Sequence, residues 1–176
     1  MYINSRPETN EYPAYYEPYI ALVPKGDIFK ILEAQVAEVS DILAGIDERN
    51  GDFAYAEGKW TIRELFVHLN DTERIFGYRA LRFARMDGTP LAGFEQDDYV
   101  KNAHASSRNL ENLADEFYHL RLSNVFLFRT LTEEALKAKG IANGKEVQVR
   151  SIVYIMIGHV AHHLRILKEC YLIAVR

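Results

Sequence analysis

The sequence has little cysteine and little proline, and it contains no long apolar run. Its single cysteine, Cys170, cannot form an intrachain disulfide, which favours the reducing cytoplasm as its location. No stretch reaches the roughly 18 to 20 consecutive apolar residues that a membrane helix needs, and the first residues lack the basic and apolar layout of a signal peptide. These absences argue against a disulfide scaffold and predict no association with a membrane.

The chain also lacks an excess of positive charge. Its 25 acidic and 21 basic residues give a formal net charge of −4 at pH 7. An acidic chain without a basic stripe is not expected to bind a nucleic-acid backbone. The composition, 48% hydrophobic and 26% charged, is that of a globular protein, and 176 residues is the length of one ordinary domain. We therefore expect a single domain over residues 1–176 that does not bind nucleic acid.

Four long segments carry apolar residues at helical spacing. They cover residues 27–47, 61–86, 107–130 and 149–172. Asp27 is a natural N-cap for the first segment, and Thr61 with Glu64 has the capping-box form at the start of the second. Turn-forming residues 87–90 end the second segment, and a long crossover, with a possible short helix at residues 94–100, leads to the third. The pattern predicts an all-α fold, a four-helix bundle with one long crossover connection.

The remaining segments carry weaker signals. Residues 1–24, rich in tyrosine and proline, are expected to be irregular and to lie over the bundle formed by residues 25–176. An Asn143-Gly144 turn precedes the fourth helical segment. Strand signals are almost absent, and the only candidate, residues 146–149, is too short to build a sheet. The sequence therefore predicts no β-sheet.

Three of the six histidines stand where the helical pattern expects an apolar residue. His159 and His163 are four residues apart, so both point to one face of the fourth helix. His68 lies in the apolar stripe of the second helix. Burying three imidazoles costs free energy unless each ring nitrogen finds a partner, and a metal ion satisfies that demand. His68, His159 and His163 are therefore candidate ligands of a divalent metal ion such as zinc, nickel, copper or iron.

Several alternatives stay open at this point. A lone core histidine is usually hydrogen-bonded rather than bound to metal, and an isolated H-x-x-x-H spacing is a weak signal. His162 is an alternative ligand to His163, although it falls at the edge of the apolar stripe. Asp71 follows His68 by three residues, so it is a candidate metal ligand, a group that orients a ligand ring, or a general base.

Two motifs together resemble those of the DinB/YfiT-like family of metal-binding four-helix bundles. One is Lys59-Trp60-Thr61-Ile62 leading into His68-Leu69-Asn70-Asp71-Thr72-Glu73-Arg74, and the other is Gly158-His159-Val160-Ala161-His162-His163. The likeness extends from about residue 10 to residue 172. It places the family's zinc or nickel ligands on His68, His159 and His163. The last motif continues as Leu164-Arg165-Ile166 where some relatives have Gly-Gln, which indicates a different branch.

The resemblance implies a bacterial metal-dependent enzyme with a small-molecule substrate. Such an enzyme would transfer a low-molecular-weight thiol, such as bacillithiol or mycothiol, to an electrophile, or would hydrolyse a small molecule. A bound ion with an open position lowers the pKa of a thiol or of water, and Asp71 or Glu73 could accept the proton. The competing hypothesis is a non-catalytic metal-binding bundle with a structural, stress-response or ligand-binding role. The resemblance also implies a homodimer.

Overall fold

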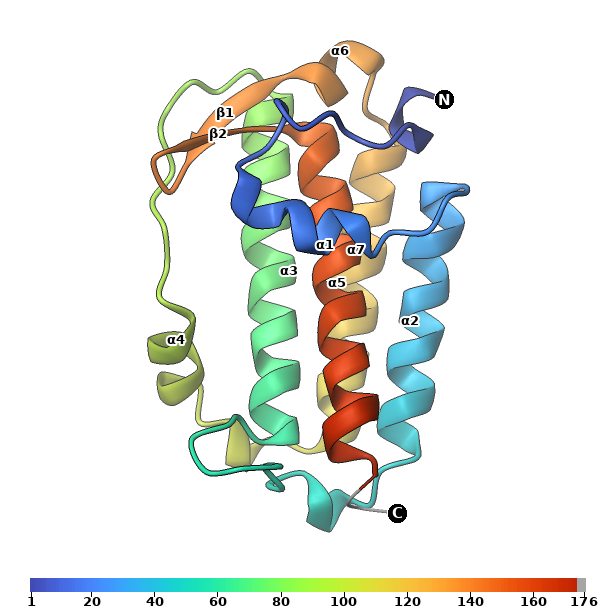
Figure 1. The fold of residues 1–176 in the computed structure, drawn as a ribbon, viewed down its shortest axis with the longest axis vertical. Helices are drawn as coiled ribbons and strands as arrows, with labels where there is room; N and C mark the ends of the chain where they lie inside the picture. The colour runs from blue at the N-terminus through green and yellow to red at the C-terminus, as the bar shows by residue number, and fades with distance from the viewer. Residues whose placement is uncertain (174–176) are drawn as a thin grey trace.

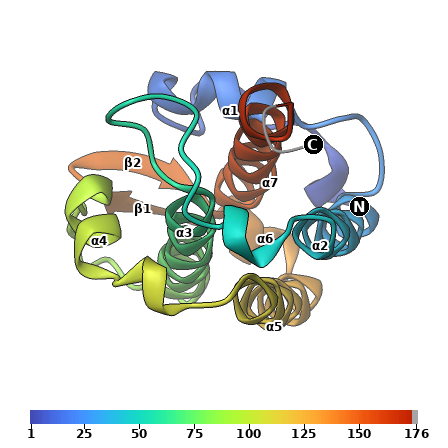
Figure 2. The same cartoon turned by 90° about the horizontal axis from the view of Figure 1, so that it is seen from below.

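The computed structural model describes residues 1–173, and its centre is a bundle of four long helices (Figure 1). These helices are α2 (Ile28–Ala44), α3 (Ile62–Ala84), α5 (Leu110–Arg129) and α7 (Val149–Ile166), and α7 continues into a π-helical turn, η5 (Leu167–Tyr171). The view from below shows the four helices side by side (Figure 2). The predicted all-α four-helix bundle is confirmed.

The helix ends follow from local side-chain chemistry. The Asp27 side chain accepts hydrogen bonds from two backbone N–H groups at the start of α2. Thr61 and Glu64 form the predicted capping box, each side chain accepting from the other residue's backbone N–H. The third helix begins later than predicted because Asn109 caps it, accepting from the backbone N–H of Asn112 at 2.7 Å.

Short helical elements connect and flank the bundle. They are η3 (Glu48–Asn50), α4 (Gln96–Asn102), η4 (Ala105–Ser107) and α6 (Glu133–Lys137). Helix α4 lies in the crossover between α3 and α5, where the sequence suggested a short helix, and it stands beside α3 in Figure 1. In the part of the chain that the structure describes, no helix is both long enough and apolar enough to cross a membrane.

The prediction that no sheet forms is wrong. Strand β1 (Lys139–Ala142) pairs in antiparallel register with β2 (Lys145–Gln148). At the tip Asn143 and Gly144 both have positive φ, 50° and 69°, as a type I′ hairpin turn requires. Four-residue strands persist here because the hairpin packs on α3, where the Phe83 ring lies directly against Gly140, a glycine with no Cβ to obstruct it.

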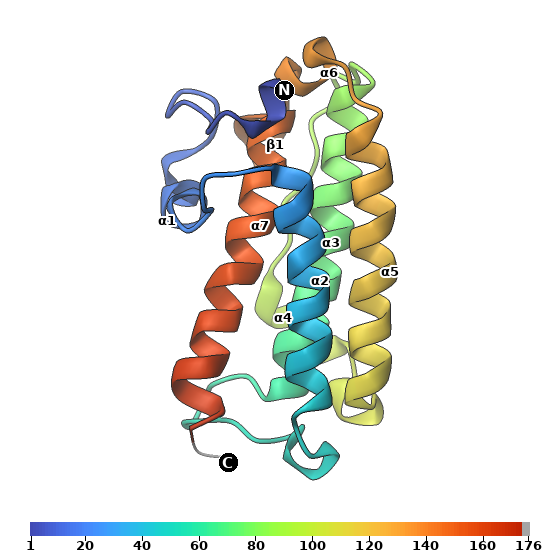
Figure 3. The same ribbon diagram turned by 90° about the vertical axis from the view of Figure 1, so that its right-hand side faces the viewer.

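The prediction of an irregular N-terminal segment is only partly right. The segment contains two 3-10 turns, η1 (Tyr2–Asn4) and η2 (Ala14–Tyr16), and a short helix, α1 (Glu17–Ala21). Helix α1 lies across the outer side of α7, so the segment does cover the bundle as expected (Figure 3). Arg6 holds it in place by donating to the carbonyl oxygens of Ile20 and Val23, at 2.6 Å each.

A polar layer crosses the middle of the bundle between two buried apolar clusters. Each of the four long helices contributes buried polar side chains between the residues that it gives to one cluster and those that it gives to the other. Gln35, Glu73, Arg121 and His159 are among them. Buried polar groups need partners, so this layer concentrates hydrogen bonding and charge at one height. His159 brings a histidine into this layer.

Arg121 is the centre of this layer. Its guanidinium donates to Glu73 Oε2 and to Gln35 Oε1, at 2.9 Å each, and its Nε lies 2.8 Å from Glu73 Oε1. Gln35 in turn donates to the carbonyl oxygen of Ile157 on α7 at 2.9 Å. One hydrogen-bonded chain therefore joins all four helices. Glu73, which the sequence offered as a proton acceptor, is ion-paired in the core.

Candidate metal centre

His68 of α3 and the pair His159 and His163 of α7 direct their Nε2 atoms at one another. The His159 Nε2 lies 3.0 Å from that of His68 and 3.1 Å from that of His163. One nitrogen from each of the three rings lies within 4.8 Å of the other two. Nitrogen ligands about 2.05 Å from a tetrahedral zinc ion are about 3.3 Å apart, so this spacing needs only a small outward movement to admit an ion.

The structure therefore brings together the three histidines that the sequence singled out. His162 lies outside the cluster, because its ring stands edge-on against Tyr19 with the centroids 5.3 Å apart. His104 and His119 are exposed. The geometry favours His163 over His162, while the assignment of the three histidines as metal ligands stays a prediction.

Burial makes the three imidazoles poor proton acceptors. It lowers the pKa of His68 to about 4 and that of His163 to about 3, and the neighbouring histidines lower the pKa of His163 further. The pKa of His159 falls well below its usual value through burial, the other histidines and the charge of Arg121. All three rings are neutral at pH 7, so their lone pairs are available to a cation.

Two aromatic side chains cover the cluster. The Trp60 ring lies 4.7 Å from the His68 ring and 6.3 Å from the nearly parallel ring of His163, centroid to centroid. The Tyr19 ring lies 5.6 Å from that of His159. Neither residue was predicted to have a role, although Trp60 is the only tryptophan in the sequence and directly precedes the cap of α3. These contacts restrict the imidazole rings to few orientations, as a preorganised ligand set requires.

The carboxylates near the site differ from the expectation. Asp71 is half-buried, 3.8 Å from Arg74; burial raises the pKa of Asp71, and Arg74 partly offsets that effect. Within residues 1–173, no hydrogen bond joins Asp71 to the three histidines. The carboxylate whose charge raises the pKa of His68, against the larger effect of burial, is that of Asp97 on α4. The role of Asp71 stays a prediction. Asp97 is a second candidate for the proton acceptor, and it could be identified only from the way the crossover folds.

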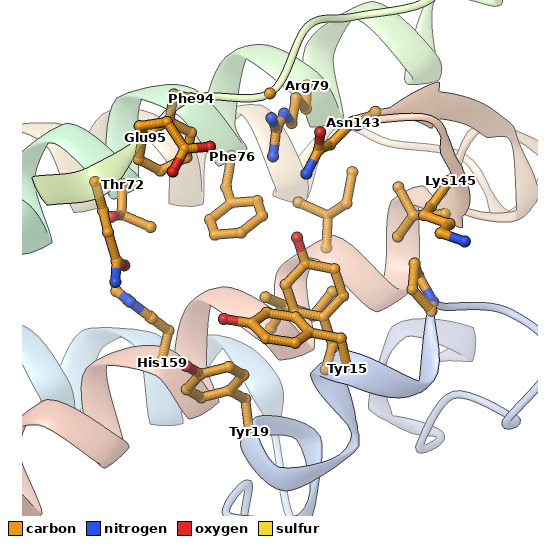
Figure 4. A pocket seen from close by; sticks show the side chains of 18 of the residues that line it. Tyr15, Tyr19, Thr72, Phe76, Arg79, Phe94, Glu95, Asn143, Lys145 and His159 are labelled. Atoms are coloured by element: carbon orange, nitrogen blue, oxygen red, sulfur yellow. The ribbon is translucent and has the colours of Figure 1, made fainter. Parts of the chain in front are cut away.

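The histidine cluster opens into a pocket with a volume of about 670 Å³ (Figure 4). His68 and His159 lie at one end of it, and α1, α3, α7, the crossover and the β-hairpin supply its walls. The walls combine aromatic and aliphatic residues, such as Tyr16, Phe76 and Ile152, with polar and charged ones. An ion held by three protein ligands beside such a pocket has coordination positions open to water or substrate.

These features define a four-helix bundle with an internal three-histidine cluster. The sequence profile of the DinB superfamily matches residues 31–167, and the chain belongs to this superfamily. The family expected from the motifs is thereby confirmed. A comparison with proteins of curated function found no match.

Two solved structures share the fold. One is YfiT from Bacillus subtilis, described as a probable metal-dependent hydrolase with an unusual four-helix bundle topology: the TM-score is 0.75 at 16% identity, over 95% of this chain and 91% of YfiT. The other is a mycothiol-dependent maleylpyruvate isomerase, with a TM-score of 0.65 at 17% identity. That match covers 82% of this chain, which spans 61% of the isomerase's length. A histidine-to-alanine mutant of the isomerase matches equally well.

Proposed function

We propose that this chain binds a divalent metal ion, zinc or nickel, through His68, His159 and His163 and catalyses attack of a small nucleophile on a small electrophilic substrate. One observation carries the proposal: three neutral imidazole nitrogens converge, and two of the three histidines, His68 and His159, line a pocket large enough for a small molecule. A divalent ion bound there supplies Lewis-acid chemistry, lowering the pKa of a thiol or of water.

The donor set fits such an ion without rebuilding the helices. Two ligands stand one turn apart on α7 and the third faces them from α3, so the helical backbone fixes all three Cα positions. Imidazole is a good ligand for both zinc and nickel. Three protein ligands around zinc leave a fourth position vacant, which is the arrangement of catalytic rather than structural sites.

The chain's own residues supply proton handling and positioning. Burial and the neighbouring Tyr15 raise the pKa of Tyr19 to about 12, so its hydroxyl keeps its proton at neutral pH and can donate a hydrogen bond to a ligand. Asp97, exposed at the pocket wall, is the candidate proton acceptor, with Asp71 as the alternative. Cys170 is half-buried in η5 and does not line the pocket, so the nucleophile is a low-molecular-weight thiol or water.

Metal content separates His163 from its neighbour His162. In protein purified without an affinity tag, we expect His163→Ala to lower the affinity for zinc or nickel by at least about 100-fold, because one of three ligand nitrogens is lost. His162→Ala is the matched control, since it removes the adjacent imidazole from outside the cluster. Elemental analysis and metal titration measure both. Equal metal content in His163→Ala and the unmodified protein would contradict the assignment of His163 as a metal ligand.

Catalysis is tested with the metal-loaded protein. We expect metal-dependent conjugation of 1-chloro-2,4-dinitrobenzene with at least one thiol of a panel containing bacillithiol, mycothiol and cysteine, or metal-dependent hydrolysis of 4-nitrophenyl acetate. His163→Ala should reduce the rate to that without enzyme, while His162→Ala should retain it, because only His163 belongs to the cluster. A protein that holds its metal but accelerates none of these reactions would instead support the non-catalytic metal-binding role.

A further inference from the structure

Arg79 is a buried arginine without an acidic partner. Four arginines of residues 1–173 are buried, and three of them pair with carboxylates: Arg63 with Glu48 and Asp52, Arg121 with Glu73, and Arg150 with Glu11. Arg79 is only 4% exposed, yet no carboxylate of residues 1–173 forms an ion pair with it. Burying an unpaired charge is costly, so a guanidinium left in this state indicates a partner from outside the chain.

The groups that contact Arg79 are all neutral. Its Nη2 donates to the carbonyl oxygen of Ala92 at 3.0 Å, and the Tyr16 hydroxyl lies beside it. The guanidinium carbon lies 5.6 Å from the centre of the Phe76 ring and 5.9 Å from that of Phe94. These contacts fix the orientation of the Arg79 guanidinium, which has five N–H donors, and they leave its positive charge uncompensated.

Arg79 lines the same pocket as the histidines. It follows His68 by eleven residues, about three helical turns, so it lies on the same face of α3 about 16 Å further along the axis. Figure 4 shows the Arg79 guanidinium and the Asn143 amide at one side of the pocket, with His159 at another. Asn143 reaches this place because the left-handed turn of the hairpin projects it there.

We propose that the pocket binds a small organic acid whose carboxylate pairs with Arg79, with the Asn143 amide beside it. The apolar body of the acid lies against Phe76 and Tyr16, which directs its other end toward the histidines. The placement of the reaction at this other end rests on the proposed function. The binding of the acid does not depend on that function. The substrate or co-substrate class is therefore a carboxylic acid with an apolar middle.

Charge at the two ends of the pocket favours this orientation. Asp97, whose charge raises the pKa of His68, lines the pocket on the histidine side. Lys145 adds a positive charge on the hairpin side. An anion is repelled by Asp97 and attracted to Arg79 and Lys145. One guanidinium with one amide matches the planar two-oxygen face of a carboxylate, which the Arg fork binds through two parallel hydrogen bonds.

The test uses isothermal titration calorimetry with 4-phenylbutyrate and its neutral analogue 4-phenyl-1-butanol. We expect the protein to bind the acid at least about tenfold more tightly than the alcohol, since a charge-assisted hydrogen bond of this kind contributes about that factor or more. Arg79→Gln should abolish the preference, and Arg79→Lys should retain part of it. Arg82→Gln is the matched control, because Arg82 is one turn further on, pairs with Asp87 and does not line the pocket.

Measurements on metal-loaded and chelator-treated samples separate Arg79 from the ion as the carboxylate's partner. Equal affinity for acid and alcohol, or a preference that survives Arg79→Gln, would overturn the proposal, as would a preference that disappears on metal removal. Tighter Arg79-dependent binding of phenyl phosphate than of 4-phenylbutyrate would overturn the carboxylate assignment. Should Arg79→Gln fail to fold by circular dichroism, Arg79→Lys decides, with a preference reduced several-fold expected. A protein that binds neither zinc nor nickel in titration but keeps the Arg79-dependent preference would support this inference and contradict the proposed metal function.

Discussion

The Arg121→Met variant is expected to lose about 3–5 kcal/mol of unfolding free energy, because it leaves Glu73 as an unpaired charge in the core. Arg121 is fully buried and Glu73 is 2% exposed, so neither water nor rearrangement of surface groups can replace the lost partner. After the substitution, Asn124 is the only side chain among residues 1–173 that still donates to the Glu73 carboxylate, at 3.0 Å. Gln35 Oε1 also loses its donor, which loosens the connection of α2 to the layer.

Chemical denaturation followed by circular dichroism measures this effect, with a chelator present because bound metal would add stability of its own. Arg129→Met is the matched control on the same helix. Arg129 pairs with Glu33 at 2.6 Å, both side chains are about half exposed, and the loss should be only about 1 kcal/mol. The double variant Arg121→Met with Glu73→Met should be more stable than Arg121→Met alone. Similar losses at Arg121 and Arg129 would contradict the role of the buried network.

The sequence predicts the four helices well because their determinants are local. Apolar spacing marks the buried faces, and the caps at Asp27 and Thr61 satisfy backbone donors within three residues. The histidine cluster could be predicted for a related reason. An i, i+4 pair fixes two ligands on one helix, so only the facing position of His68 had to be inferred from its apolar stripe.

The features that the sequence could not supply depend on contacts between distant segments. The hairpin is held by Phe83 and by Leu91, which donates to Ile141 O at 2.9 Å, and no short-range pattern reveals either contact. Asp97 reaches His68 only because the crossover folds back along α3. The sequence does mark Arg79, because a charged residue three turns after His68 interrupts the same face of the helix. The importance of Arg79 could not be predicted, because it depends on the fold placing no carboxylate of residues 1–173 in an ion pair with it.

Gly158 is another position whose importance only the fold reveals. A Cβ atom added there would lie 1.9 Å from the carbonyl oxygen of Tyr19 and 2.4 Å from its carbonyl carbon. Helix α1 therefore crosses α7 with backbone nearly touching backbone, and this close approach sets Tyr19 against His159. Any side chain at residue 158 must displace α1, which carries part of the pocket wall, and the displacement would move the Tyr19 ring away from the histidine cluster.

The Gly158→Ala variant is accordingly expected to lose about 2–3 kcal/mol of unfolding free energy through overpacking. The sign of the change is diagnostic, because alanine in an unobstructed helix interior would instead add about 0.5–1 kcal/mol. Gly88→Ala is the control, since no atom lies within 4 Å of a Cβ added at Gly88, and its stability should change little. Denaturation of the metal-free variants measures both. A Gly158→Ala protein as stable as its parent would mean that α1 is not seated on α7, and Tyr19 could then not restrict the ring of His159.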